Sequence, residues 1–140
     1  MLDASGESSN LGESGEVTPE VLQDIHDIVN RYQNFECVEC ADEIEEYLKM
    51  QKIRGRRIKL DTTRQVRDDD YIYDDSLPEM SNPIATNGHH EGIAIRINEE
   101  EKVFDNHHPD GVLTAQWMNN LQFISKVHGG ASFRKSGYLF

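Results

Sequence analysis

The sequence predicts an α+β fold in which N-terminal helices pack on an antiparallel β-meander. Two observations support this class. Apolar residues recur with a period of 3.6 residues before residue 52, which is typical of helices with one buried face. After residue 56 they alternate with polar residues, which is typical of strands with one buried face. Helices that precede a group of strands, instead of alternating with them, favour the α+β class.

The length of 140 residues fits one domain with a modest core. Residues 1–16 form an acidic segment that is rich in Gly and Ser and poor in apolar residues. Such a segment cannot recover the entropy lost on ordering. We therefore predict a flexible lead-in at residues 1–16 and a folded domain at residues 17–140. The two cysteines are too few for a disulfide scaffold, so the fold must depend on its core.

The net charge of −12 argues against binding to nucleic acid or to an anionic membrane surface, because both are negatively charged. The sequence has no run of ~18 apolar residues, so we expect no membrane insertion. The N-terminus lacks a positive region followed by an apolar run, so we expect no secretory signal peptide. Any export would therefore depend on other machinery.

Two helices are predicted in the first part of the chain. Thr18, Pro19 and Glu20 are typical of a helix start, with a hydroxyl cap, a proline in the first turn and then an acid. Apolar residues follow at helical spacing over residues 21–32. A second helix is expected at about residues 37–51, with its charged residues on the opposite side from its apolar stripe.

The rest of the domain is predicted to be mostly extended. The strands expected from alternation are, in chain order, residues 57–61, 71–73, 84–86, 90–97 and 102–105. Apart from its short strand, the stretch 62–83 is predicted as a long loop, and long loops in compact domains are often functional. We expect a polar loop at residues 106–113 and then a short helix from Thr114 to Leu121.

Cys37 is the first candidate for catalysis, because it opens the second predicted helix. Backbone N–H groups at a helix start lack partners within the helix, and the helix dipole there favours negative charge. Thiols in such positions have a larger thiolate fraction, which a cysteine nucleophile requires. We therefore assign Cys37 as the nucleophile and Cys40, one turn further along, as a packed neighbour. The reverse assignment and two inert, buried cysteines are the alternatives.

His90 is the second candidate, because it opens the predicted strand at residues 90–97. Alternation places His90, Gly92 and Ala94 on one face of the strand and the isoleucines on the other. The small residues leave room for another group to approach the imidazole. A histidine there can reach a thiol at the start of a packed helix and act as its general base and acid. His89 is expected to face away.

Asp105 ends the neighbouring predicted strand and is the candidate third residue of the site. If the strands at residues 90–97 and 102–105 pair through the turn between them, Asp105 comes near His90. It would then orient the imidazole and stabilise its charged form. Asn106 is the alternative for this role.

Asn34 and Gln33 precede Cys37 and are candidates to bind an oxyanion through a side-chain amide, together with the backbone N–H of Cys37. His107 and His108 fall in the predicted polar loop and are expected at the surface or at the rim of a substrate site. This set of residues requires no metal and no organic cofactor, so none is predicted.

Three segments together resemble a known family. They are CVECA at residues 37–41, NGHHEGIAI at residues 87–95 and VFDNHHPDG at residues 103–111. In this order they are similar to the papain-fold toxins among bacterial polymorphic toxins, and look closest to the second papain-fold toxin group. The similarity extends from Gln33 to Leu121. The H-x-G-I-x-I pattern is also similar to the histidine strand of NlpC-type cell-wall peptidases, and C-x-x-C-A resembles the helix start of papain.

The resemblance implies a papain-like fold and a cysteine hydrolase that acts as a peptidase or as a deamidase of glutamine side chains in a target protein. Together with the residues above, it predicts a triad of Cys37, His90 and Asp105. It also implies a cognate immunity protein in the producing bacterium, in whose cytoplasm the toxin is made, and delivery to a target cell by a specialised secretion system. The papain helix start would instead place the nucleophile at the second cysteine, Cys40.

Three other interpretations compete with the hydrolase. A zinc site would use both cysteines and the two His-His pairs, although the histidine spacing matches no common zinc finger. A redox C-x-x-C site normally follows a strand, whereas a helix is predicted before these cysteines. The third interpretation is a non-catalytic protein-binding module on a papain-like fold.

Overall fold

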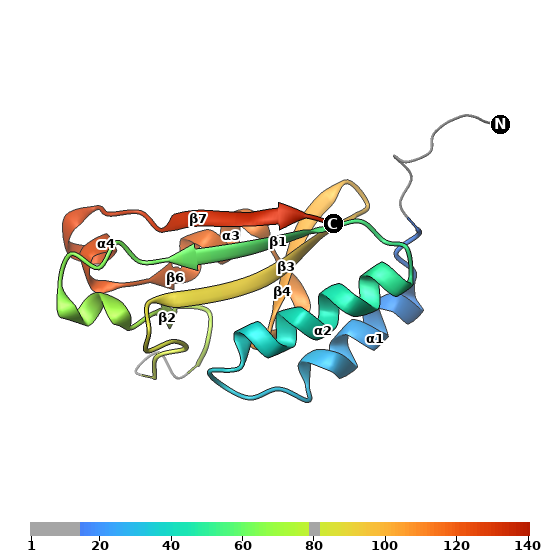
Figure 1. The fold of residues 1–140 in the computed structure, drawn as a ribbon, viewed down its shortest axis with the longest axis horizontal. Coiled ribbons are helices and arrows are strands. Elements are labelled where there is room, and N and C mark those ends of the chain that lie inside the picture. Colours follow the sequence, from blue (N-terminus) through green and yellow to red (C-terminus); the bar gives the residue numbers. More distant parts are fainter. Residues whose placement is uncertain (1–14, 79–81) are drawn as a thin grey trace.

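The computed structural model describes residues 15–78 and 82–140, so the predicted lead-in lies outside the described residues except for its last two positions. The chain forms an α+β fold, as predicted. Two helices, α1 (Pro19–Val29) and α2 (Cys37–Met50), pack against one face of a five-stranded antiparallel sheet (Figure 1). The order of its strands is β5-β4-β3-β1-β7.

The remaining elements are short. The strands of the large sheet are β1 (Arg56–Asp61), β3 (His89–Ile97), β4 (Glu100–Asp105), β5 (His108–Leu113) and β7 (Arg134–Leu139). A second sheet pairs β2 (Tyr73–Asp74) with β6 (Leu121–Gln122). The other helices are the 3-10 helix η2 (Arg67–Asp70), α3 (Thr114–Asn120) and α4 (Ile124–Gly129).

Three consecutive strands, β3, β4 and β5, form the predicted meander, and β1 and β7 extend the sheet beyond it. The expectation of a polar loop at residues 106–113 is wrong, because most of this stretch is β5. Pro109 and the Asp110-Gly111 pair suggest a loop, but β5 lies at the edge of the sheet, where proline is tolerated. The sequence pattern does not predict β7, because all six of its residues are exposed and none shows the alternation of a half-buried strand.

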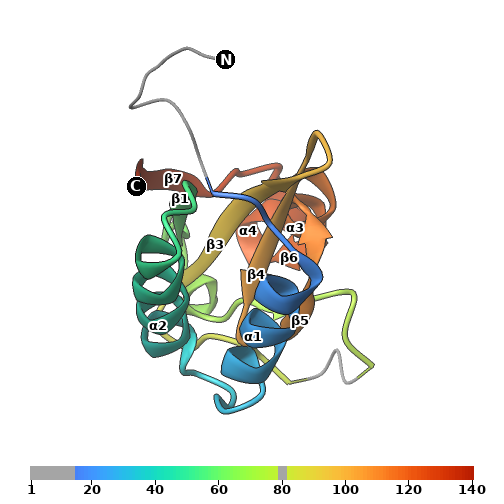
Figure 2. The ribbon, with the colours of Figure 1, turned by 90° about the vertical axis from the view of Figure 1, so that its right-hand side faces the viewer.

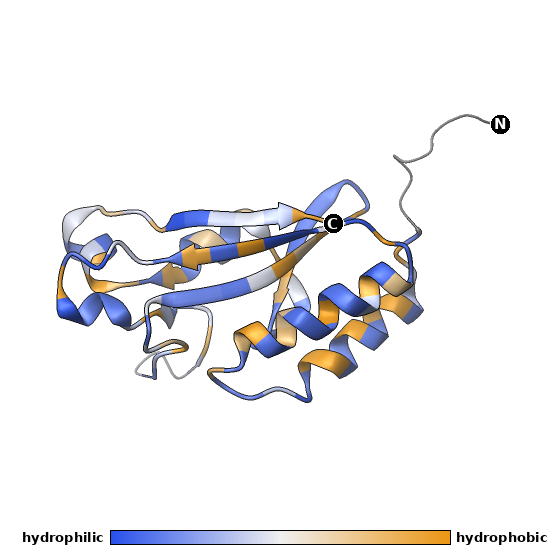
Figure 3. Cartoon of the chain, in the orientation of Figure 1, coloured by the Kyte–Doolittle hydropathy of each residue, from blue (hydrophilic) through white to orange (hydrophobic). Residues whose placement is uncertain are grey.

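The two predicted N-terminal helices are confirmed. The Thr18 hydroxyl oxygen accepts a hydrogen bond of 3.2 Å from the backbone N–H of Val21, and Pro19 occupies the first turn. The second helix begins at Cys37, as predicted, although no side chain caps its start. The apolar residues of both helices recur at helical spacing, as the orange segments along the ribbons show (Figure 3).

The large sheet separates two apolar cores. The core under α1 and α2 includes Ile25, Ile44, Leu48, Ile93 and Phe104. The core on the opposite face includes Leu60, Ala94, Val103, Trp117 and Leu121. Figure 2 shows α1 and α2 side by side, with α3 and α4 separated from them by the strands. Residues at even positions of β3 therefore face α3, and residues at odd positions face α2, as the alternation predicts.

The predicted loop at residues 62–83 contains η2 and β2. The strands expected at 71–73 and 84–86 are reduced to β2, shifted by two residues, and to one isolated bridge between Ile72 and Ala85. Asp69 anchors this stretch, because its buried carboxylate accepts hydrogen bonds from the backbone N–H and the hydroxyl of Ser125 in α4. Within the described ranges, no helix has the length and apolar character needed to cross a membrane.

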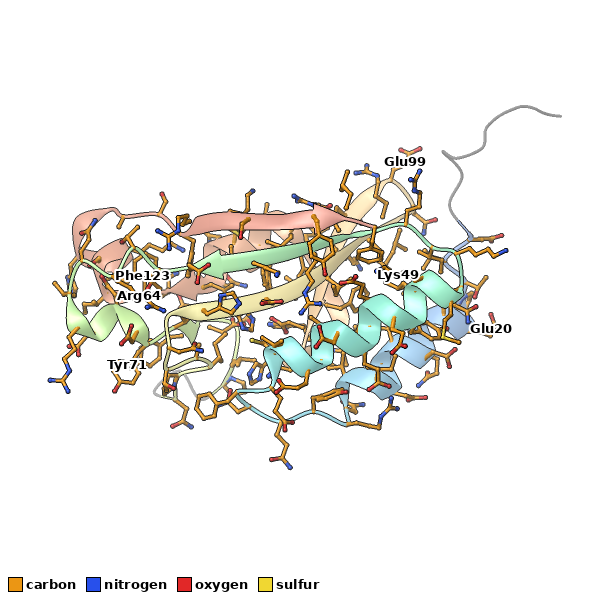
Figure 4. All side chains as sticks on the ribbon, viewed as in Figure 1. Glu20, Lys49, Arg64, Tyr71, Glu99 and Phe123 are labelled. Atoms are coloured by element: carbon orange, nitrogen blue, oxygen red, sulfur yellow. The ribbon has the colours of Figure 1, made fainter. Side chains whose placement is uncertain are left out.

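The C-terminal residue is joined to the connection between α2 and β1. The backbone N–H of Phe140 donates to the carbonyl of Gly55 at 2.9 Å, and the N–H of Gly55 donates to the carbonyl of Phe140 at 3.1 Å. Lys49, labelled on α2 in Figure 4, places its Nζ 5.9 Å from the centre of the Phe140 ring. At the other end of the described chain, the N–H of Gly15 donates to the carbonyl of Lys52 at 2.7 Å.

Candidate active site

The start of β3 extends beyond β4, and the candidate site lies at this point. β3 pairs with β1 from His89 to Ala94, but it pairs with β4 only from Ile93 to Ile97. His90 therefore has a neighbouring strand on one side only. On the other side, β4 ends at Asp105, which brings its carboxylate to the imidazole.

His90 is completely buried, and its two ring nitrogens have different surroundings. Its Nε2 lies 2.8 Å from Oδ2 of Asp105 and donates a hydrogen bond to it. Its Nδ1 is also buried but has no hydrogen-bond partner among the described residues, although the Cys37 side chain lies close enough to act on the ring. Burial alone lowers the pKa of His90, but the hydrogen bond with Asp105 and the neighbouring Cys37 outweigh it and raise the pKa to about 10.

Asp105 is buried and accepts three hydrogen bonds. Besides His90, the indole Nε1–H of Trp117 donates to Oδ2 at 2.8 Å, and the backbone N–H of His107 donates to Oδ1 at 2.9 Å. Burial raises the pKa of Asp105, but the hydrogen bond and charge of His90 outweigh that effect and hold the pKa well below its usual range. The carboxylate is therefore charged and fixed in position against the imidazole.

The room on the histidine face of β3 is filled by the protein itself. A Cβ added at Gly92 would lie 2.6 Å from Cγ1 of Val103 and 3.0 Å from the Trp117 ring. The Trp117 and His90 ring centres are 5.8 Å apart. Gly92 therefore admits the indole that reaches Asp105, and this corrects the expectation that the small residues leave space for an approaching group.

Cys37 and Cys40 lie in different surroundings. Cys37 is the first residue of α2, is 7% exposed and lines a cavity of about 90 Å³. The same cavity is lined by Phe35, Val38, residues 84–87 and His89. Cys40 is completely buried in the core under the helices, and this burial is the main reason that its pKa is raised to about 12. Of the two thiols, only Cys37 combines a position beside His90 with access to a cavity.

The segment before Cys37 is held by polar contacts. The side-chain amide of Asn106 donates to the carbonyl of Gln33 at 2.9 Å, and that of Asn34 donates to the carbonyl of Pro83 at 3.0 Å. His107 lies with its Nε2 3.0 Å from Oδ1 of Asn34. Asn106, the alternative to Asp105, therefore contacts this segment and makes no hydrogen bond to His90 that the structure describes.

A family model for papain fold toxin 2 matches residues 20–122, which is well over half of the chain. The chain belongs to this family. The matched span contains every residue of the site described above, from Gln33 to Trp117. Neither the curated proteins nor the solved structures include a match to this papain fold toxin.

The sequence did not indicate two contacts of this papain fold toxin. The first is the hydrogen bond from Trp117 to Asp105. A buried indole N–H needs an acceptor, so a buried carboxylate could have been expected beside Trp117, but the sequence pattern does not identify which carboxylate it is. His108 was expected in a loop at the surface or rim. It lies instead in β5, partly buried, with its Nε2 2.8 Å from Oδ2 of the buried Asp74.

His89 faces away from His90, as the alternation predicts, and contacts two carboxylates, but it lines the same cavity as Cys37. Its Nδ1 lies 2.9 Å from Oδ1 of Asp61, and its Nε2 lies 2.5 Å from Oε2 of Glu91. Glu91 also accepts a hydrogen bond of 2.7 Å from Arg57. Across residues 15–78 and 82–140, no group of three or more His, Cys, Asp and Glu side chains is arranged to hold a metal ion.

Proposed function

We propose that this papain fold toxin is a cysteine hydrolase with Cys37 as nucleophile, His90 as general base and acid, and Asp105 as the residue that orients His90. The observation that most supports this is the asymmetry of the His90 ring. One nitrogen is hydrogen-bonded to Asp105, and the other is buried beside Cys37 without a hydrogen-bond partner. Buried polar atoms normally have partners, so an open nitrogen next to a thiol fits a base that receives the thiol proton.

The proposed reaction has two halves. At neutral pH His90, with its pKa raised to about 10, already holds the proton received from Cys37, and the thiolate attacks an amide carbon of the substrate. His90 then gives its proton to the leaving amine, which leaves a thioester on Cys37. His90 next deprotonates a water molecule, which attacks the thioester and releases the acid. The charge of Asp105 stabilises the imidazolium that forms in each half.

The start of α2 is the proposed site for the oxyanion of the tetrahedral intermediate. No side chain caps this helix, so its first N–H groups and its dipole are available to a negative charge beside Cys37. The Asn34 amide already donates to Pro83, and Gln33 is exposed. We therefore assign the backbone N–H of Cys37 as the main donor.

The proposed substrate is an amide bond in a target protein. We infer that the enzyme acts as a peptidase or as a deamidase of glutamine side chains, since both reactions pass through the same thioester. The small cavity beside Cys37 is the proposed entry point. As in a toxin system, a cognate immunity protein is expected to bind the domain in the bacterium that makes it, before delivery to a target cell.

The first experiment is the rate of alkylation of each cysteine as a function of pH, measured by mass spectrometry in the wild type and in His90→Ala, Asp105→Ala and Cys40→Ala. We expect fast labelling of Cys37 near neutral pH, a marked decrease in His90→Ala, a smaller decrease in Asp105→Ala and little change in Cys40→Ala. Fast labelling of Cys40 instead would move the nucleophile to that residue. Slow labelling of every thiol present in the four proteins would favour a non-catalytic binding module.

A further inference from the structure

The chain has two cysteines, and both are free thiols located one turn apart at the start of the same helix. The proposed hydrolase uses Cys37 and leaves Cys40 without a role. The backbone N–H of Cys40 donates to the carbonyl of Glu36 at 3.0 Å, so the first turn of α2 is regular at this point.

The geometry of this turn suits a bond between the two sulfur atoms. Residues three apart in a regular helix have Cα atoms about 5 Å apart and side chains on the same face. That separation falls within the range found for disulfides. No side chain caps the start of α2, where Cys37 lies. The two cysteines are also close enough for the charge of Cys37 to act on Cys40.

The two thiols differ in access. Cys37 is reached from the cavity of about 90 Å³, whereas Cys40 has no exposed surface. A small oxidant therefore meets Cys37 before Cys40. Activated thiols that an oxidant can reach, next to a second, resolving cysteine, are typical of redox-sensitive sites; Cys37 is buried but opens on the cavity.

We propose that Cys37 and Cys40 form a reversible disulfide that closes the active site. Hydrogen peroxide transfers one oxygen to the Cys37 thiolate, which is oxidised to sulfenic acid, while the rest of the peroxide takes up a proton from solution and is reduced to water. The Cys40 sulfur then displaces the hydroxyl group of Cys37. The S–S bond forms as the S–O bond breaks, and the Cys40 proton leaves with the hydroxyl group as a second water. Burial raises the pKa of Cys40 to about 12, so at neutral pH Cys40 must lose its proton as its sulfur attacks, which makes this the slow step of the reaction.

The disulfide gives the protein an inactive state in oxidising surroundings and an active state in reducing ones. The formation of the bond depends only on the two cysteines, while its effect on catalysis rests on the proposed function. The cytosolic glutathione and thioredoxin systems reduce accessible disulfides, so the thiolate of Cys37 would be restored there. The same bond would prevent further, irreversible oxidation of Cys37.

The test compares the reduced wild type, Cys40→Ser, Cys40→Ala and Cys37→Ser after incubation with hydrogen peroxide, by intact mass and by counting free thiols. The wild type is expected to lose two hydrogens and both free thiols, and dithiothreitol should restore both. Both Cys40 variants should gain oxygen atoms at Cys37 and resist rescue by dithiothreitol. In Cys37→Ser, the buried Cys40 should remain a free thiol.

Sulfinic acid at Cys37 of the wild type, with Cys40 still free, would overturn the proposal. Agreement between the two Cys40 variants, checked for folding by circular dichroism, excludes an effect of one substituted side chain. If the disulfide forms but the alkylation rate of reduced Cys37 does not depend on His90, this proposal stands and the proposed hydrolase function fails. If no disulfide forms but the alkylation rate of Cys37 does depend on His90, the proposed hydrolase function stands and the disulfide proposal fails.

Discussion

Two neighbouring histidines of β3, His89 and His90, each contact a carboxylate, but they lie on opposite faces of the sheet. His90 uses one ring nitrogen for Asp105 and leaves the other beside Cys37. His89 uses one nitrogen for Asp61 and the other for Glu91. A carboxylate next to a histidine therefore does not distinguish a catalytic base from a structural ion pair. The distinguishing feature is the second nitrogen, which must remain available to a nucleophile.

The largest expected effect separates the two histidines by reactivity. His90→Gln should lower the rate of Cys37 alkylation at neutral pH about ten- to hundredfold, because the imidazole that takes the thiol proton is lost. His89→Gln should change the rate less than about threefold, because Asp61 and Glu91 already engage both nitrogens of His89. The measurement is the second-order rate constant with iodoacetamide. Equal losses in both variants would show that the two histidines do not differ as proposed.

A second expectation concerns the contribution of His89 to the free energy of unfolding. The hydrogen bond with Glu91 is the main reason that the pKa of His89 is raised to about 9, and the contact with Asp61 adds to it. A raised pKa stabilises the fold fully below the unfolded value of ~6.5, and the effect disappears as the pH rises through 9. The wild type should therefore exceed His89→Gln by about 1–2 kcal/mol at pH 6 and by much less at pH 10.

Urea unfolding at both pH values measures this difference. His90 also has a raised pKa, of about 10, and loses its own contribution at higher pH. That contribution is present in both proteins and cancels in the comparison. A difference between wild type and His89→Gln that stays constant from pH 6 to pH 10 would mean that the charge of His89 is not what stabilises the end of β1 against β3.

The smallest expected effect concerns the residue that supports Asp105. Trp117→Phe removes the indole N–H that donates to Oδ2 but keeps an aromatic ring against His90. Asp105 retains its hydrogen bonds from His90 and from the backbone of His107, so the free energy of unfolding should fall by only about 1–2 kcal/mol. Cys37 alkylation should slow less than tenfold. A loss of reactivity as large as that of His90→Gln would make Trp117 a primary positioning residue.

Much of the fold could be predicted from local pattern. The cap at Thr18, the helical spacing after it and the alternation in β3 depend on residues close in sequence. β5 and β7 could not be predicted in this way. β5 carries turn-forming residues at a sheet edge, and β7 has no buried face.

The candidate site, like the fold, could be predicted from the sequence only in part. Cys37 at a helix start, His90 at a strand start and Asp105 at a strand end could be chosen from the sequence, and the structure brings them together, while their catalytic roles stay a prediction. The contact of Trp117 with Asp105 could not be chosen, because it depends on how α3 crosses the sheet. The surroundings of Gly92 could not be predicted from the sequence either. The sequence indicates space at Gly92, and only the packing shows that an indole fills it.

Both ends of the described chain are attached to one place, the connection between α2 and β1. Gly15 bonds to Lys52, and Phe140 bonds to Gly55. This connection lies at the opposite end of α2 from Cys37 (Figure 1). Closely spaced ends on the surface tolerate fusion, insertion into another protein and circular permutation. Another protein can therefore be fused at either end of the domain, or at both. The fusion point would lie at the opposite end of α2 from Cys37.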